Sequence, residues 1–140
     1  MDQRLKELKA SDVMTETVFT ANLDHTWKDV ARKMSAKNIH HLVVLDDNNL
    51  PINVISTSDF IGFALNKDAK ALSRKLRDTI SGKRLITVLP DSNAYDAANL
   101  MNDHHVESVV VVNETGQLKG IVTPKDVMNE ILFEDESSFD

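Results

Sequence analysis

The hydrophobic and polar positions of this chain predict the same series of elements twice. After Asp24, and again after Asp91, apolar residues recur at the three- and four-residue spacing of an amphipathic helix. Aspartate is a good helix N-cap, so a helix is predicted to begin at each of these acids. The apolar positions are Trp27, Val30, Ala31 and Met34 in the first copy and Ala94, Ala97, Ala98 and Met101 in the second.

Each predicted helix is followed by two short strands. The first strand is an uninterrupted apolar run rich in β-branched residues, which is typical of a strand buried on both faces. Turn residues come next, and a second apolar run predicts the second strand. The predicted strands cover residues 42–45 and 52–55 in the first copy and residues 109–112 and 118–122 in the second.

A second helix follows these strands in each copy. It is led by Ser56 or Thr57 in the first copy and by Thr123 in the second. Pro124 can occupy the first helical turn, where a missing amide proton costs nothing. The repeated unit is therefore strand, helix, strand, strand, helix, and the predicted fold class is α/β.

The two copies align over nearly the whole chain. A shift of 67 positions pairs Met34 with Met101 and Asp59 with Asp126 without a gap, and a shift of 66 continues the match upstream. We therefore expect two tandem repeats joined by a basic, solvated helix. The expected division is a first repeat with its lead-in at 1–66, a helical linker at 67–78, a second repeat at 79–134 and a disordered acidic tail at 135–140.

Composition excludes several classes of function. A net charge of −6 argues against a general nucleic-acid binder, which needs a clustered positive face. The 140 residues include no apolar run long enough to cross a bilayer and no signal peptide, so we expect a cytoplasmic protein without a membrane partner. The absence of cysteine excludes disulfides, thiolate metal sites and thiol nucleophiles.

The histidines do not predict a metal site, and no motif predicts an enzyme. Neighbouring residues on a strand point to opposite faces, and His104 aligns with Lys37, not with a histidine of the first copy. We therefore expect His40, His41, His104 and His105 at the surface or at helix ends rather than around a metal ion. His25 is expected as an exposed residue of a first helical turn. Phosphate-binding loops, metalloprotease motifs and nucleophile elbows do not occur, and the sequence has only four glycines from which to build such loops.

The tandem order resembles the CBS domain, named after cystathionine β-synthase. The similarity covers about residues 9–133, with DVMT at 12–15 as the start of the first copy and GIVTPKD at 120–126 near the end of the second. The resemblance implies two β-α-β-β-α repeats packed as a pseudo-two-fold module that often forms a homodimer. It also implies a non-enzymatic regulatory protein that binds AMP, ADP, ATP or S-adenosylmethionine between its repeats and needs no obligatory cofactor.

The resemblance assigns phosphate and ribose contacts to two pairs, Ser56 with Asp59 and Thr123 with Asp126. A helix N-terminus presents free amides and a partial positive charge, which suit a phosphate. A carboxylate one turn later can accept hydrogen bonds from two ribose hydroxyls. The same residues would also serve as an N-cap and a first-turn acid in any protein, so both interpretations stay open.

The resemblance places the base against the segment that enters the first strand of each copy. Apolar residues there would equally serve as core. The assigned residues are Thr17, Val18 and Phe19 in the first copy and Arg84, Leu85 and Ile86 in the second. His40 and His41 hold the positions of phosphate-binding cations in the first copy. The second copy has Glu107 and Ser108 there, and in the first copy Asn53 replaces the usual glycine.

The main alternative function is a dimerisation or adaptor module with vestigial sites, whose output is contact with a regulated protein. Basic residues of the linker, such as Arg74 and Arg77, would serve either function, as phosphate contacts or as part of a docking surface. A DNA-associated regulator is a weaker alternative, which the acidic charge disfavours.

Overall fold

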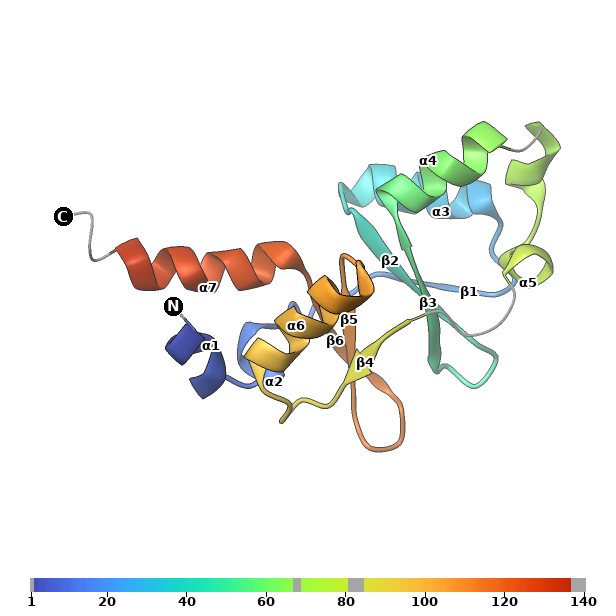
Figure 1. Cartoon of the computed structure of the whole chain (residues 1–140). Helices are drawn as coiled ribbons and strands as arrows, with labels where there is room; N and C mark the ends of the chain where they lie inside the picture. The colour runs from blue at the N-terminus through green and yellow to red at the C-terminus, as the bar shows by residue number, and fades with distance from the viewer. Residues whose placement is uncertain (1, 67–68, 81–84, 137–140) are drawn as a thin grey trace. The chain divides into compact units, whose positions relative to one another are not determined.

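The structure is a computed structural model that describes residues 2–66, 69–80 and 85–136 (Figure 1). Contacts divide the chain into two compact units. The first unit consists of residues 18–85, and the second consists of residues 1–17 together with 86–140. Each unit holds one three-stranded sheet, so each contains the body of one copy of the repeat.

The first unit has the predicted order of strand, helix, strand, strand, helix. Its elements are β1 (Thr20–Asn22), α3 (Trp27–Lys37), β2 (His41–Leu45), β3 (Pro51–Ser56), α4 (Thr57–Asn66), the 3-10 helix η1 (Ala69–Ser73) and α5 (Leu76–Thr79). Strand β1 is parallel to β2, and β2 is antiparallel to β3. Helices α3 and α4 cover the same side of this sheet (Figure 1).

The core of the first unit lies between the sheet and these two helices. Leu42 and Val44 of β2 are fully buried in it. The ring of Trp27, at the start of α3, stacks on Phe63 of α4 with their centroids 4.0 Å apart. Val43, whose side chain points to the opposite face of β2, is also fully buried. The prediction of a strand buried on both faces is confirmed.

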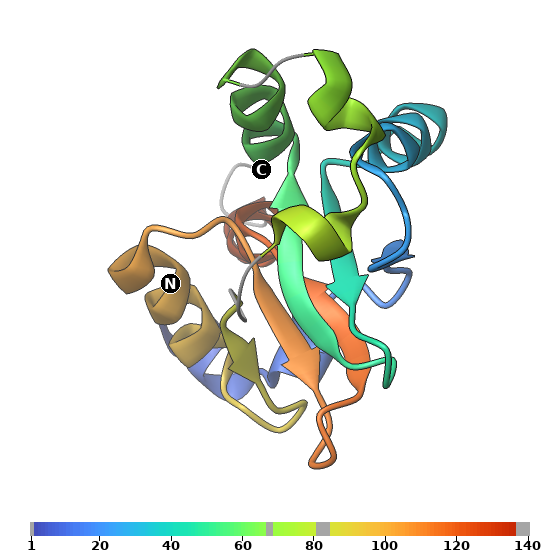
Figure 2. The same cartoon turned by 90° about the vertical axis from the view of Figure 1, so that its right-hand side faces the viewer.

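The second unit repeats this topology with additional N-terminal helices. Its elements are α1 (Asp2–Glu7), α2 (Ala10–Val13), β4 (Thr87–Val88), α6 (Ala94–His104), β5 (Val109–Val112), β6 (Leu118–Val122) and α7 (Pro124–Glu136). Figure 2 shows the sheet in the order β4-β5-β6, in which β4 is parallel and β6 antiparallel to β5. The mixed α/β fold predicted from the repeat is confirmed in both units.

The N-terminal segment belongs to the second unit because it supplies part of that unit's core. Leu5, Ala10 and Val13 are buried in the same cluster as the strand residues Val109 and Val111. Burial of these apolar side chains is the main favourable contribution to their docking. The N-terminal helices therefore stabilise the copy that lies later in the chain.

Each copy is preceded by a short segment that packs against the body of the other copy. These segments, called the first and second lead-in, comprise residues 8–15 and 74–80. Lys9 forms an antiparallel bridge with Asn93, and Lys75 forms one with Thr26. In the repeat, Lys9 aligns with Lys75 and Asn93 aligns with Thr26. Each lead-in therefore packs on the opposite copy through the same bridge.

The expected linker is helical in part, but it is not solvated along its whole length. It contains η1 and α5, and Leu76 at the start of α5 is fully buried in the core of the first unit. The amide of Leu76 donates to the carbonyl of His25 at 2.8 Å. The mixed charges of residues 67–78 predicted a solvated helix, although Leu72 and Leu76 within this run both pack in the core of the first unit.

The predicted N-caps were wrong by two residues in both copies. Thr26 caps α3, because its side chain accepts from the amide of Asp29 while the Asp29 carboxylate accepts from the amide of Thr26. Asn93 caps α6 by accepting from the amide of Tyr95. Thr26 forms a full capping box with the acid at the third helical position, and Asp24 has no acid at that spacing.

The last helix, α7, begins where the sequence predicts and ends later than expected. Pro124 is the first residue of α7, as expected, and α7 continues to Glu136, so it includes the start of the segment assigned to the acidic tail. Residues 137–140 lie outside the described residues.

Within the described part of the chain, no helix combines the length and the apolar composition that crossing a bilayer requires.

Candidate functional site

The first hydroxyl and carboxylate pair, Ser56 with Asp59, forms a capping box at the start of α4. The amide of Ser56 donates to Oδ2 of Asp59 at 3.1 Å, and the amide of Asp59 donates to Oγ of Ser56 at 3.0 Å. Asp59 is exposed. Ser56 and Asp59 therefore cap α4, and the Asp59 carboxylate remains open to solvent.

The second pair, Thr123 with Asp126, forms the same box at the start of α7. The amide and the hydroxyl of Thr123 donate to Oδ2 of Asp126 at 2.9 and 3.1 Å, and the amide of Asp126 lies 3.4 Å from the Thr123 hydroxyl. A third residue joins this pair, because the hydroxyl of Thr15 donates to Oδ1 of Asp126 at 2.9 Å. Both carboxylate oxygens of Asp126 are therefore hydrogen-bonded.

The contact of Thr15 depends on Gly120. A Cβ atom at position 120 would lie 2.5 Å from Sδ of Met14 and 3.0 Å from the carbonyl oxygen of Thr15. The glycine thus permits the first lead-in to approach β6, where Thr15 pairs with Ile121. Asn53 holds the aligned position in the first copy. In the second copy, the glycine of this position therefore admits a segment of the chain itself.

The histidines assigned to phosphate binding lie at the same end of the first sheet as Ser56. His41 pairs with Ser56 across β2 and β3. The carbonyl of His40 accepts from the amide of Thr57 at 3.0 Å, at the first residue of α4. The backbone therefore places His40 and His41 beside Ser56 and Thr57, and their use as phosphate contacts stays a prediction.

The residues assigned to the base have structural roles that the structure defines. The carbonyl of Phe19 accepts from the amide of Val43 at 3.0 Å, and the carbonyl of Ile86 accepts from the amide of Val110 at 2.9 Å. Each therefore extends the first strand of its copy. Their use as a base slot stays a prediction.

The chain passes from one unit to the other within both assigned segments. Thr17 ends the N-terminal part of the second unit, and Val18 begins the first unit. Leu85 ends the first unit and precedes Ile86, which packs against the core of the second. Arg84 lies outside the described residues. The segments assigned to the base therefore include the two points at which the chain passes from one unit to the other.

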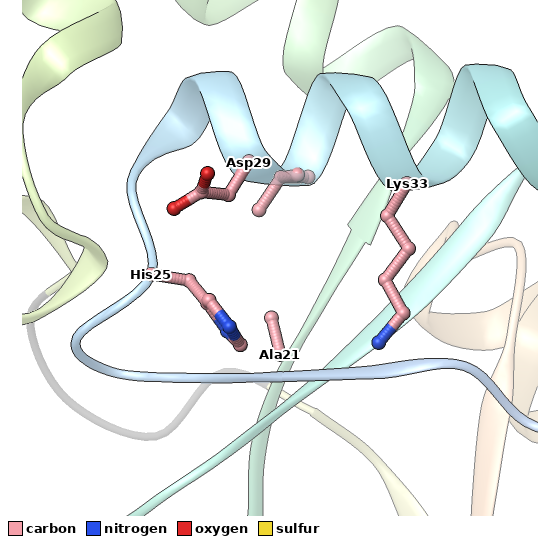
Figure 3. A pocket seen from close by; sticks show the side chains of 5 residues that line it. Ala21, His25, Asp29 and Lys33 are labelled. Carbon is pink, nitrogen blue, oxygen red and sulfur yellow. The ribbon is translucent and has the colours of Figure 1, made fainter.

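A small hollow lies between β1 and α3 of the first unit (Figure 3). Its volume is about 50 Å³, and Ala21, His25, Asp29 and Lys33 line it together with Val30. Pockets for small ligands have volumes of about 300 to 1,000 Å³, so this space is too small for a nucleotide. The hollow is not the candidate site.

The polar groups of the hollow are already used within the fold. Nδ1 of His25 accepts from the amide of Asn22 at 3.0 Å, and the Lys33 ammonium donates to the carbonyl of Thr20. Hydrogen bonds from Thr26 hold the pKa of Asp29 below its ordinary value. His25 is half-buried in the turn before α3, so its expected place as an exposed first-turn residue was wrong.

Arg77 of the linker is engaged in ion pairs of the first unit. Its guanidinium donates to both carboxylate oxygens of Asp47, at 2.7 and 2.9 Å, and to Asp24 at 3.3 Å. These contacts lower the pKa of Asp47 and raise that of Arg77. Arg77 therefore fastens the second lead-in to the turn between β2 and β3, a role that the charge run did not reveal.

The described residues offer no group of three or more histidine, aspartate or glutamate side chains that could hold a metal ion. His104 is the last residue of α6, and His105 follows it in the left-handed conformation with φ 54°. Both lie at a helix end, which is one of the two positions expected for them.

Comparison with known proteins gives a family match across both copies. A family model described as CBS domain matches residues 10–66 and 76–133. An uncharacterised protein of Methanocaldococcus jannaschii is 30% identical over 127 residues, which cover 91% of this chain and 40% of that protein. The chain spans 32% and 25% of two further curated relatives.

Two solved structures have the same fold. The crystal structure of CBSX2 in complex with AMP is 25% identical with a TM-score of 0.77, covering 91% of this chain and 98% of that one. The CBS domain pair of protein MJ0100, in complex with 5'-methylthioadenosine and S-adenosylmethionine, is 21% identical with a TM-score of 0.75 and covers 88% and 98%. The chain, with its two matched repeats, belongs to the CBS domain family.

Proposed function

We propose that the chain is a non-enzymatic regulatory module of the cytoplasm that binds an adenosine-type nucleotide. The observation that carries this proposal is the geometry of Asp59 at the start of α4. Among the described residues, only Oδ2 of its carboxylate has a hydrogen-bond partner, the amide of Ser56. The exposed carboxylate can therefore accept a further pair of hydroxyl donors.

The chemistry of a nucleotide matches the groups around this carboxylate. Two vicinal ribose hydroxyls are paired donors, and a carboxylate is a strong acceptor for them. The N-terminus of α4 carries a partial positive charge that suits a phosphate, and His40 and His41 lie at the same end of the sheet. The AMP complex of the CBSX2 relative supports an adenosine ligand.

The test is a titration of purified protein with AMP, ADP, ATP, S-adenosylmethionine, 5'-methylthioadenosine and NAD, with GMP as the selectivity control. A ligand that binds only the folded state raises Tm, and calorimetry then gives Kd. We expect an adenosine-selective response, which Asp59→Ala weakens by about tenfold or more because a charged acceptor is lost.

The matched control is Asp12→Ala. The Asp12 carboxylate accepts from the amide of Lys9 at 2.8 Å at the start of α2, so it has the same local capping role and is also exposed. It should lower Tm without changing Kd. An equal loss of stability in both variants, with unchanged affinity in each, would show that Asp59 is a cap and nothing more.

A second candidate function, a dimerisation or adaptor module, rests on exposed apolar side chains. Ile61 and Leu65 of α4 are 50% and 79% exposed, and Met128 of α7 is 54% exposed. Ile61 and Met128 hold aligned positions in the two copies, so the repeat places an apolar residue on the outside of the same helix twice. We propose that these helices bind a second copy of the chain.

Sedimentation analysis tests the dimer directly. Ile61→Glu with Met128→Glu should convert a dimer to a monomer, because burying a charge at an apolar contact is costly. Leu89→Glu is the control, since Leu89 is 45% exposed but lies outside both helices. A monomeric unmodified protein, or a dimer that survives both charges, would exclude this interface.

A further inference from the structure

Other residues of the chain already occupy the candidate ribose acceptor of the second copy, Asp126. The carboxylate of Asp126 accepts from the amide and hydroxyl of Thr123 at Oδ2 and from the hydroxyl of Thr15 at Oδ1. The Thr15 hydroxyl lies 2.9 Å from Oδ1, a distance typical of a charge-assisted hydrogen bond. With the two donors from Thr123, three of the roughly four acceptor positions of the carboxylate are in use, which leaves too few for two ribose hydroxyls.

The backbone holds Thr15 in this position. Its amide donates to the carbonyl of Ile121 at 2.8 Å, and the amide of Ile121 donates to the carbonyl of Thr15 at 3.0 Å. The side chain of Met14 fills the space beside Gly120, which belongs to β6, the strand of Ile121. The hydroxyl is therefore presented to Asp126 by a paired segment, which lowers the entropy lost when the hydrogen bond forms.

We propose that Thr15 competes with ribose for Asp126 and so weakens nucleotide binding at the second site. This inference rests on the proposed function and adds to it a residue that sets the affinity of that site. A ribose hydroxyl takes the place of the Thr15 hydroxyl on Oδ1 of Asp126 only when the hydrogen bond from Thr15 is broken. Thr15 is thus a specificity-determining residue of the second site.

Breaking this contact also affects the connection between units. The chain leaves the second unit after Thr17, only two residues beyond Thr15. A nucleotide that binds Asp126 releases the end of the first lead-in and favours conformations in which this segment is loosened. Ligand binding shifts that equilibrium only by the difference in its affinity for the two states.

Calorimetry with AMP in an Asp59→Ala background isolates the second site. Thr15→Val removes the hydroxyl but keeps the β-branched shape that suits the paired backbone. We expect it to tighten AMP binding about three- to tenfold, because the ligand no longer displaces an exposed charge-assisted hydrogen bond. Thr15→Ser, which keeps the hydroxyl, should bind AMP like the background chain.

Thr115→Val provides the matched control in the same unit. The Thr115 hydroxyl also donates to a side-chain oxygen, Oδ1 of Asn113 at 2.8 Å, but it lies in the turn between β5 and β6. It should leave the Kd of AMP unchanged. Equal affinity in the chains with and without Thr15→Val would overturn the competition, and weaker binding with Thr15→Val would show that the hydroxyl assists the ligand.

Amide hydrogen exchange provides a second readout that does not depend on the Thr15→Val variant. Saturating AMP should accelerate exchange at the amides of Thr15 and Ile121 in the Asp59→Ala chain, and unchanged exchange overturns the proposal. If AMP binds the unmodified chain but none of the chains that carry Asp59→Ala, the proposal is also overturned. An absence of AMP binding in all chains, the unmodified one included, instead contradicts the proposed function itself.

Discussion

The two lead-ins make the same backbone pairs but use different side chains as anchors. In the second unit, the first lead-in packs Ala10 into the core and donates a hydroxyl from Thr15 to Asp126. In the first unit, the second lead-in packs the larger Leu76 into the core and binds two acids through Arg77. The first lead-in is thus held by several apolar residues near a candidate ligand site, and the second by a buried leucine together with an ion pair.

This difference shows what the repeat conserves within the molecule and what each copy has changed. The aligned bridges of Lys9 with Asn93 and of Lys75 with Thr26 depend on backbone groups, which every residue type carries. The contacts that hold each lead-in in its core depend on side chains. These side chains differ between the two copies, although the backbone bridges are the same. In the second unit the first lead-in also hydrogen-bonds Asp126 through Thr15, whereas residue 81, which aligns with Thr15, lies outside the described residues.

Leu76→Ala should have the largest effect on this comparison. Leu76 is fully buried, and truncating a buried leucine costs about 2 to 5 kcal/mol of unfolding free energy. Urea unfolding measures the loss, and Leu89→Ala, at a 45% exposed position, is the control. A loss below about 1 kcal/mol, on the same scale as ordinary surface substitutions, would show that the second lead-in is not anchored by its leucine.

Gly120→Ala should have the next largest effect. The added methyl group would lie 2.5 Å from Met14 and 3.0 Å from a backbone oxygen, so the first lead-in must move, at a cost of about 1 to 3 kcal/mol.

Gly62→Ala, within α4, is the control for Gly120→Ala. No atom lies within 4 Å of its added Cβ, and alanine is the better helix former there by about 0.5 to 1 kcal/mol. Equal thermal stability of the two variants would contradict the close approach of the lead-in.

Arg77→Met should have the smallest effect, and this effect depends on pH. Arg77 lowers the pKa of Asp47 in the folded state, so the pair stabilises the fold at pH values above the ordinary Asp value of 3.8. That contribution is lost as the pH falls through the lowered pKa. Tm should therefore differ between the variant and the parent at pH 7, and the difference should shrink towards pH 3.

Arg74→Met is the control for the charge change alone, because Arg74 is an exposed arginine of the same segment. It should give a smaller difference in Tm at pH 7 and no narrowing at low pH. A difference between Arg77→Met and the parent that stays constant from pH 7 to pH 3 would contradict the role of Asp47, since it would not follow the titration of that carboxylate.

The candidate site was predicted in part because its residues are local in sequence. Ser56 with Asp59, and Thr123 with Asp126, are three residues apart, a spacing that a helix start brings together. Thr15 was missed as a partner of Asp126 because 111 positions separate them, and no local pattern reports such a contact.

The sequence by itself determined the repeat, the order of helices and strands, and the family. These features depend on hydrophobic spacing and on turn and capping residues, which act over a few neighbouring positions. It misplaced the start of two helices, because Asp24 and Thr26 are both good caps and the choice depends on Asp29.

Only the tertiary structure decided that the lead-ins are exchanged between the copies. Either lead-in could have packed on its own copy as far as hydrophobic pattern and charge can tell. The choice depends on long-range complementarity, namely the space beside Gly120 for Met14, the buried position of Leu76 and the acids that receive Arg77. The same complementarity places the Thr15 hydroxyl on Asp126, a contact that the local motif around Asp126 does not encode.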